Sequence, residues 1–407
     1  MNDANIHFIT GQNNLYEDYY TSHNIQKSSL DSLFLWLKSK EINNSMYFAV
    51  DTETTAHDPF YSTILLIQIG DKDRQYVIDC TTVDIKSFIK PYLESKDWLK
   101  YLHNAKFDYK HITHHWGIKL ERIYDTFLAE MCLFNGLQFK GYGLKDLVEK
   151  YSNNRVTLQK DVRETFGPST INFTIPQIQY AAADVRYFEL IVEEQQKLAK
   201  QYELIECVRL ENEAVLAYGD IELNGLLIDT EAWKSIALEQ EQKLREQEKK
   251  LDQYLITLSR EDTRFKKFVS DGIPQSLFAD IDLPVEKKGK RANTHNRKQV
   301  LVEWSSQQQV LPIFKLHGID TTYTDVKTNE TRESISAMIL EKNRNIPFIQ
   351  IYEEYKKAQK QVDSFGLKFL SHINEKTGRI HPTFKQLGTE TGRVSCNEPR
   401  INWAFYW

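Results

Sequence analysis

Three spaced groups of polar residues in the first half of the chain could bind metal ions. Asp51 and Glu53 stand two residues apart at the end of an apolar run, MYFAVDTET. Successive side chains of a strand alternate between its two faces, so both carboxylates would lie on one face and could bind the same cation. For this pair alone, the alternative is two solvated acids at the end of a strand.

The other two groups show the i, i+4 spacing that places side chains on one face of a helix. Asn104 and Asp108 occur in HNAKFD, and Tyr180 and Asp184 occur in YAAAD. Each pair taken alone also fits an ordinary helix surface or a partly buried tyrosine. Carboxylate oxygens suit hard divalent cations such as Mg²⁺ and Mn²⁺, so the three groups together indicate a site for such ions.

The segments around these residues predict an α/β domain. MYFAVDTET, TILLIQIGD and QYVIDC are short apolar runs separated by polar turns, and we expect them to form adjacent strands. A helix is expected over 28–40, with Ser28 or Ser29 as its cap. Because strands come first and most helices later, we expect a mixed sheet with helices packed on it. Further helical patterns cover 84–95, 107–117, 125–136, 142–151 and 176–202.

The ordered set of DxE, NxxxD and YxxxD resembles the tyrosine-containing (DEDDy) subclass of the DEDD exonuclease superfamily. Proofreading domains of family A DNA polymerases and RNase D-type nucleases belong to that subclass. The resemblance implies a ribonuclease H-like (RNase H-like) fold over roughly residues 1–200 and a pair of divalent cations, Mg²⁺ or Mn²⁺. It assigns metal binding and catalysis to Asp51, Glu53, Asp108 and Asp184, with Tyr180 as a further catalytic residue.

The same resemblance gives these residues separate roles. Asp51 would bridge the two cations, and Glu53 and Tyr180 would position the attacking water. A phenol with an ordinary pKa of about 10 can donate and accept hydrogen bonds at pH 7, which suits Tyr180 to that role. Asn104 would contact the primer end.

Two nearby groups of residues could also be mistaken for site residues. His111, His114 and His115 show helical spacing that could suit zinc, but no fourth ligand with recognisable spacing accompanies them. Asp125 precedes an apolar helical pattern, and we expect it to cap that helix rather than to take part in catalysis.

The pattern becomes almost entirely helical near residue 204. We therefore expect a 3′–5′ exonuclease domain at 1–203 and a second, α-rich region at 204–407. A long helix is expected over 230–255 with Thr230 as its cap, and the remaining expected helices cover 298–306, 332–342 and 348–373. This region resembles the thumb and the start of the palm of family A DNA polymerases. The resemblance rests on NG-x-x-ID, beginning at Asn224, and on the Thr-Gly-Arg sequence that ends at Arg393.

Basic residues gather in a predicted loop of the second region. Charge alone fits either a solvated loop or a phosphate-binding patch. The family resemblance places this loop at the thumb tip, where it would hold duplex phosphates, and places Arg393 near the primer–template. The basic residues are Lys287, Lys288, Lys290, Arg291, Arg297 and Lys298.

The sequence stops at Trp407, before the palm carboxylates and fingers that the resemblance would lead us to expect. We therefore expect a truncated product or the N-terminal half of a split polymerase, which alone would not extend a primer. The aromatic residues Trp403, Phe405, Tyr406 and Trp407 would suit an interface or a scar of frame change.

Composition narrows the class of protein. Hydrophobic residues make up 41% and charged residues 27% of the chain, as in soluble globular proteins. No run of 18 apolar residues occurs and the N-terminus does not read as a signal peptide, so neither a membrane span nor export is expected. Four scattered cysteines favour a reducing, cytoplasmic location. The net charge of −5 does not by itself indicate nucleic-acid binding.

The expected function is removal of nucleotides from DNA 3′ ends, with single-stranded or frayed ends preferred. Two alternatives stay open from the sequence. One is an RNase D-like 3′–5′ exoribonuclease with the same chemistry. The other is a non-catalytic subunit that partners a separate C-terminal polymerase half.

Overall fold

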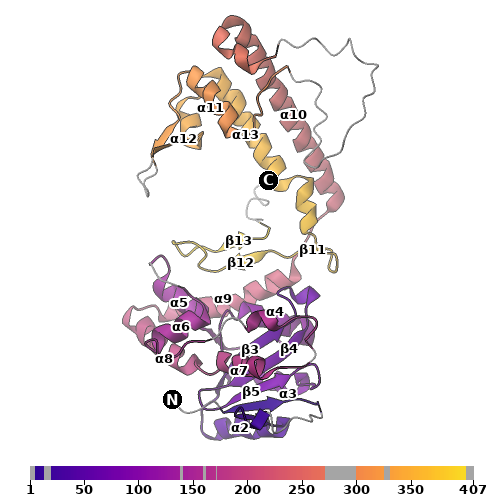
Figure 1. The fold of residues 1–407 in the computed structure, drawn as a ribbon, viewed down its shortest axis with the longest axis vertical. Helices are drawn as coiled ribbons and strands as arrows, with labels where there is room; N and C mark the ends of the chain where they lie inside the picture. Colours follow the sequence, from indigo (N-terminus) through magenta and orange to yellow (C-terminus); the bar gives the residue numbers. More distant parts are fainter. Residues whose placement is uncertain are drawn as a thin grey trace. The chain divides into compact units, whose positions relative to one another are not determined.

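The computed structural model describes residues 5–12, 20–137, 141–158, 162–170, 172–270, 299–324 and 331–399. The basic loop residues Lys287, Lys288, Lys290, Arg291, Arg297 and Lys298 lie outside the described residues, as do the aromatic residues of 403–407. In the described part of the chain, no helix is long and apolar enough to cross a membrane. The chain divides into two compact units, Met1–Leu227 with Ile373–Trp407, and Ile228–His372 (Figure 1).

The first unit is built on a mixed sheet with the strand order β2-β1-β5-β4-β3-β6-β7. β4 runs antiparallel to both β3 and β5, and the other neighbouring strands run parallel. The three predicted strands are confirmed as β3, β4 and β5, whereas the four shorter strands escaped prediction because three or four residues show little alternation. The strands are β1 (Ile6–Ile9), β2 (Ile25–Lys27), β3 (Tyr47–Thr54), β4 (Ile64–Gly70), β5 (Gln75–Asp79), β6 (Leu99–Leu102) and β7 (Ile123–Asp125).

Helices cover both faces of this sheet, which confirms the expected α/β class. On one face, Leu33 and Ile112 of two helices share a buried cluster with Val50 of β3. On the other face, Ile178 and Ala181 pack with the opposite side chains of the sheet. The helices are α2 (Leu30–Ile42), which Ser29 caps as predicted, α3 (Lys86–Leu93), α4 (Lys106–Trp116), α5 (Thr126–Phe134), α6 (Leu144–Tyr151), α7 (Ile175–Asp184), α8 (Phe188–Gln201) and α9 (Ile205–Asn224).

The prediction of one continuous helix over 176–202 is wrong. The chain forms α7 and α8 instead, and α7 ends at Asp184. Val185 follows at the break and is fully buried in a small cluster with Ala49 and Phe188. No Gly or Pro marks this break, so the periodicity of the sequence does not show it. The break places Asp184 at the last residue of a helix that packs directly on the sheet.

The segment after residue 372 belongs to the first unit. Its strand β11 (Arg379–Ile380) pairs with β8 (Leu226–Leu227), and β12 (Thr383–Lys385) pairs with β13 (Ser395–Asn397). The compact units therefore separate after Leu227, because α9 packs on α4 and α5. The domain boundary predicted between residues 203 and 204 came from the resemblance to family segments, and it stays a prediction.

A buried carboxylate joins α4, α9 and β12 within this unit. Glu222 is 2% exposed and accepts from the ammonium groups of Lys106 and Lys110, the second at 2.7 Å. The backbone N–H of Phe384 donates to the same carboxylate at 2.8 Å. Because Lys106 begins α4, this cluster fixes the helix that carries Asp108.

Glu222→Gln is expected to lower the free energy of unfolding of the first unit by about 3 kcal/mol, since the amide leaves two ammonium groups without a counter-charge. Thermal unfolding of the full chain measures this change. Glu213→Gln is the matched control, because Glu213 lies on the same helix and is exposed. Equal stability of the two variants would show that the cluster is not important for the fold.

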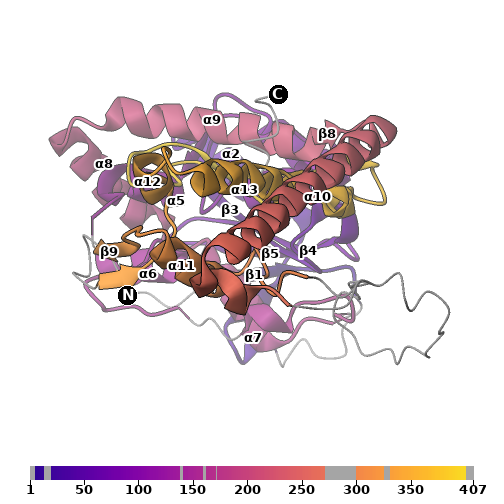
Figure 2. The same ribbon diagram turned by 90° about the horizontal axis from the view of Figure 1, so that it is seen from above.

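The second unit is helical around its own core. α10 (Thr230–Glu261) packs along α13 (Pro347–Phe365), as both views show (Figures 1 and 2). Their shared cluster includes Leu251, Phe348 and Tyr352. The unit also contains α11 (Gln307–Leu316), α12 (Ala337–Lys342), β9 (Thr322–Thr324), β10 (Thr331–Glu333) and the 3₁₀ helices η3 (Thr263–Phe268) and η5 (Leu367–His372).

Four details of the second unit differ from the predictions. The helix expected over 348–373 ends at Phe365, and the 3₁₀ helix η5 follows it. The cap of α10 is Asp229, which accepts from two backbone N–H groups, and Thr230 is the first helical residue. The segment 299–306 is not a helix. Val300 forms an isolated antiparallel β-bridge with Val269. Trp304 is buried, and its indole N–H donates to Asp252. The predicted helix over 332–342 begins only at Ala337, after β10.

Candidate active site

β3 carries Asp51 and Glu53 to the same face of the sheet. Ala49, on that face, packs with Val185 and so marks it as the side that α7 and α8 cover. The pairing of β3 with β6 extends from Tyr47 to Ala49, so both acids lie beyond the last paired residue on that edge. The period-2 expectation for DxE is therefore met by the geometry of the strand.

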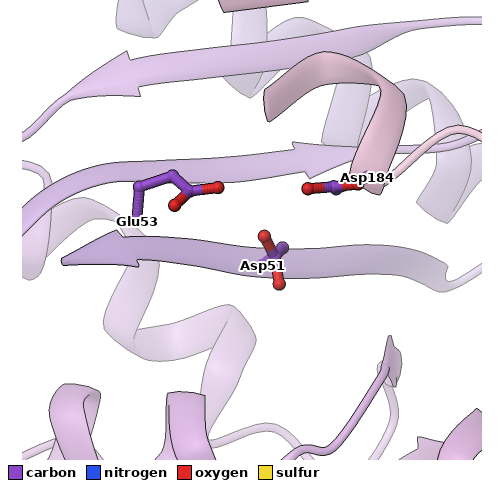
Figure 3. Close-up of side chains that lie close together, drawn as sticks. All are labelled: Asp51, Glu53 and Asp184. Carbon is purple, nitrogen blue, oxygen red and sulfur yellow. The ribbon is translucent and has the colours of Figure 1, made fainter. Parts of the chain in front are cut away.

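Asp184 reaches the same place from the end of α7. One carboxylate oxygen each from Asp51, Glu53 and Asp184 lies within 4.8 Å of the others. Figure 3 shows the carboxylates of Glu53 and Asp184 pointing toward one another, with Asp51 beside them. In the described part of the chain, no other group of three acidic, histidine or cysteine ligands is arranged in this way.

Asp108 lies in the first turn of α4 and lines the same cavity, outside the group of three. It is 1% exposed, and the Thr52 hydroxyl donates to its Oδ1 at 2.6 Å. Asn104 also lines the cavity, but it does not share a helix face with Asp108 as the spacing predicted. Its φ of 61° lies in the left-handed region, and α4 begins only at Lys106.

Asp125 holds the turn between β6 and α4 in place. Its carboxylate accepts from the backbone N–H groups of Asn104 and Ala105 at 2.9 and 2.8 Å. The same carboxylate accepts from Phe127 and Leu128, so the prediction that it caps α5 is confirmed. The additional bonds to the turn before α4 could not be read from the sequence, because they join segments twenty residues apart.

Burial sets the protonation of the acidic group. It raises the pKa of Asp51 to about 7. Burial, followed by repulsion from neighbouring carboxylates, raises the pKa values of Glu53, Asp108 and Asp184 well above their ordinary values. Without a counter-charge, the carboxylates therefore hold protons close to neutral pH. All the donors are carboxylate oxygens, which fits a hard divalent cation that would replace those protons.

Tyr180 stands one helical turn before Asp184 on α7, as its spacing predicted. Its hydroxyl and the Asp184 carboxylate are close enough to influence each other's pKa. Burial, and then the charges of Asp184, Glu53 and Asp51, raise the pKa of Tyr180 far above its ordinary value. The phenol is therefore neutral near pH 7, where it can orient a water molecule.

These side chains share a cavity of about 830 Å³. Its wall also holds aromatic and aliphatic side chains, which suit a nucleobase, and two cations that sequence reasoning did not find. Neither cation belongs to a spaced motif, so no sequence signal distinguished it from a surface residue. These further lining residues include Phe107, Phe127, Leu144, Leu158, Phe166, Lys145 and Arg163.

Two other predicted features do not join this cavity. Arg393 is exposed on a turn beyond β12, where its backbone N–H donates to Thr389 Oγ1 at 2.9 Å. Both ring nitrogens of His111 face backbone carbonyls, of Phe107 at 3.0 Å and Ala56 at 3.3 Å. This arrangement favours a structural role for His111 over zinc binding, and within the described residues no histidine belongs to a metal-binding group.

Comparison with known families finds two matches along the chain. Residues 28–201 match the family described as 3′–5′ exonuclease, and residues 302–403 match DNA polymerase family A. DNA polymerase I of Aquifex aeolicus is 26% identical over 385 residues, which cover 89% of this chain. Together, the two family matches and this relative support a family A DNA polymerase.

The chain spans about half the length of that relative, 55% of it. The fold agrees with the polymerase domain of Pol1 from M. smegmatis, solved with a DNA primer-template and dNTP, at a TM-score of 0.61 and 17% identity. That match covers 91% of this chain and 54% of the solved one. Ribonuclease D of Zymomonas mobilis is 30% identical over 159 residues, 39% of each protein.

The chain thus carries a 3′–5′ exonuclease domain, which points to an enzyme of the nuclease class. Such a domain implies a nucleic acid substrate and the use of divalent metal, and the group of three carboxylates agrees with the second. The RNase H-like fold that the resemblance implied is the fold of the first unit.

Proposed function

We propose that this chain hydrolyses nucleotides from the 3′ ends of DNA with two divalent cations, Mg²⁺ or Mn²⁺. The observation that carries the proposal is the group of three carboxylates within 4.8 Å, buried in the cavity of a 3′–5′ exonuclease domain. A structural salt-bridge cluster would contain basic partners. In the described part of the chain, none of these three acids forms an ion pair.

Each acid has a proposed place in the metal site. Asp51, Glu53 and Asp184 would hold one cation, and Asp51 would also bridge to a second cation near Asp108. Thr52 keeps Asp108 in its rotamer through the 2.6 Å hydrogen bond. When bound, the cations would supply Lewis acidity at the phosphate and lower the pKa of an attacking water.

The side chains of this chain would then orient the reactants. Tyr180 and Glu53 would hold the attacking water by hydrogen bonds, and the rigid α7 would keep Tyr180 in register with Asp184. The oxygen of water bonds to the terminal phosphorus, and the bond from phosphorus to the 3′ oxygen of the preceding nucleotide breaks. Water loses one proton to solvent and the departing oxygen gains one, so the products are a nucleoside 5′-monophosphate and a strand with a new 3′ hydroxyl.

The second half of the chain supports DNA over RNA. Residues 302–403 match DNA polymerase family A, whereas the Ribonuclease D relative matches over 159 residues, 39% of this chain. We infer that single-stranded or frayed DNA ends are preferred, because a terminal nucleotide must leave the base stack to enter a buried site. A polypeptide that carries the remaining polymerase motifs is a proposed partner, which co-purification would reveal.

A pair of 5′-labelled oligonucleotides with the same sequence, one of DNA and one of RNA, tests the substrate. With Mg²⁺ we expect the single-stranded DNA to shorten from its 3′ end at least about tenfold faster than the RNA. A fully paired blunt duplex serves as the control and should shorten more slowly than the single strand. Faster loss of the RNA would favour the RNase D-like alternative.

A further inference from the structure

Arg163 is a cation in the wall of the acidic cavity. It opens the short 3₁₀ helix η2 (Arg163–Thr165) and lines the same cavity as the three carboxylates. Its charge is close enough to oppose the rise in pKa of Asp51, Glu53 and Asp184. Lys145 also lines the cavity, but its charge is not among the causes of these pKa shifts.

Arg163 differs from the structural cations of this unit. Lys40, Lys106 and Lys150 each form an ion pair of 2.7 Å or less with a well-buried carboxylate. Arg163 is exposed, and within the described residues its side chain forms no ion pair or hydrogen bond. A guanidinium placed near several acids without binding any of them is available for another anion.

The backbone segment that carries Arg163 is tied to the helix of the other proposed catalytic groups. The Gln177 side chain donates to the backbone carbonyl of Thr165 at 3.3 Å and lies 3.1 Å from its hydroxyl. Gln177 lies on α7, three residues before Tyr180, so η2 is tied to the helix that carries Tyr180 and Asp184. The rings of Phe166 and Tyr180 lie 6.3 Å apart and add a second contact between the two elements.

The electrostatics of the site indicate when Arg163 would act. Bound cations neutralise the carboxylates, so their attraction for the guanidinium weakens when the site is loaded. The phosphodiester of the substrate would then be the anion that attracts the guanidinium. Guanidinium groups bind phosphate oxygens in a bidentate geometry. Negative charge on the phosphoryl oxygens redistributes during displacement, and a fixed cation nearby stabilises that state.

We propose that Arg163 is a further catalytic residue, whose guanidinium binds non-bridging oxygens of the phosphate that is hydrolysed. This inference rests on the proposed exonuclease function. Arg163 donates hydrogen bonds and transfers no proton, so the bonds made and broken are those of the hydrolysis itself. Arg163 would thereby add a positive charge from the protein to a site whose other positive charges would come from metal ions.

The test compares Arg163→Ala and Arg163→Lys with the wild-type full chain on a single-stranded DNA oligonucleotide. At saturating DNA we expect kcat to fall about a hundredfold in Arg163→Ala and less in Arg163→Lys. Added guanidinium chloride should restore part of the activity of Arg163→Ala, which loss of a structural contact would not allow. Arg155→Ala is the control, because Arg155 is exposed and does not line the cavity.

Two binding measurements distinguish phosphate binding by Arg163 from a purely structural role. Mn²⁺ should bind Arg163→Ala at least as tightly as wild type, because the lost charge repelled cations, and a deoxynucleoside 5′-monophosphate should bind about tenfold more weakly in the presence of Mn²⁺. Wild-type kcat in a variant that binds the monophosphate normally would overturn the inference, as would weakened Mn²⁺ binding without rescue. An inactive wild-type chain would instead contradict the proposed function, and monophosphate binding would still decide whether Arg163 contacts phosphate.

Discussion

Asp184→Ala is expected to lower metal-dependent shortening of DNA by about a thousandfold, because the variant loses one of three carboxylates that would hold the same cation. The side chain is short and lies at the end of α7, so its removal leaves the packing of Ile178 and Ala181 in place. Initial rates of shortening with Mg²⁺ or Mn²⁺ measure the effect.

Two controls accompany this variant. Glu193→Ala removes an exposed acid from α8 and should retain the wild-type rate. Circular dichroism and thermal unfolding should show that Asp184→Ala is folded. Near-normal, metal-dependent shortening by the folded variant would mean that Asp184 is not a metal ligand.

Metal-free protein is expected to become less stable as pH rises from about 4 to about 7. Burial raises the pKa of Asp51 to about 7 in the folded chain, from an ordinary value of 3.8. Below the ordinary value, both folded and unfolded states hold the proton and no stability is lost. Above it, the unfolded state releases the proton first, so the free energy of unfolding falls and levels off once pH exceeds the folded pKa.

The loss from Asp51 alone should reach about 4 kcal/mol, and Mg²⁺ should reverse it at about pH 8. Thermal unfolding in chelator and in Mg²⁺ at a series of pH values gives the measurement. Asp51→Asn removes the titration of Asp51, so it should be more stable than wild type in chelator at about pH 8 and gain less from Mg²⁺ than wild type does. An Asp51→Asn protein that is less stable than wild type under those conditions would contradict the electrostatic account.

The sequence allowed the positions of Asp51, Glu53, Tyr180 and Asp184 to be predicted because their spacing reflects local geometry. A strand places residues i and i+2 on one face, and a helix places i and i+4 on one face. Both rules depend on a few consecutive residues, and the structure brings the three acids together. Their catalytic roles remain predictions that the variants above test.

Other features depend on contacts between distant segments and so escaped prediction. Asn104 lines the cavity from a left-handed turn that Asp125 holds, and not from the helix face that its spacing indicated. Arg163 stands near the acids only because Gln177 ties η2 to α7. The break after Asp184 follows from the burial of Val185 and leaves no trace in the periodicity.

In the fold as well, features set by neighbouring residues were predicted from the sequence, and features set by contacts between distant segments were not. The central strands β3 to β5 are long and apolar, and their pattern alone identified them. Segment 299–306 has a helical pattern, yet the burial of Trp304 and its bond to Asp252 hold it in an irregular conformation. Residues 373–399 return to the first unit through the pairing of β11 with β8 and the bond of Phe384 to Glu222, and neither contact gives a sequence signal.

Product analysis with a 5′-labelled single-stranded DNA oligonucleotide tests the central proposal most directly. Wild-type protein with Mg²⁺ should give a ladder of 5′-labelled strands that shorten one nucleotide at a time, together with free nucleoside 5′-monophosphates. Chelator or Asp184→Ala should leave the strand intact. Release of the 5′ label as a mononucleotide from the start, cleavage within the strand, or equal shortening in chelator would contradict a metal-dependent 3′–5′ exonuclease at Asp51, Glu53 and Asp184.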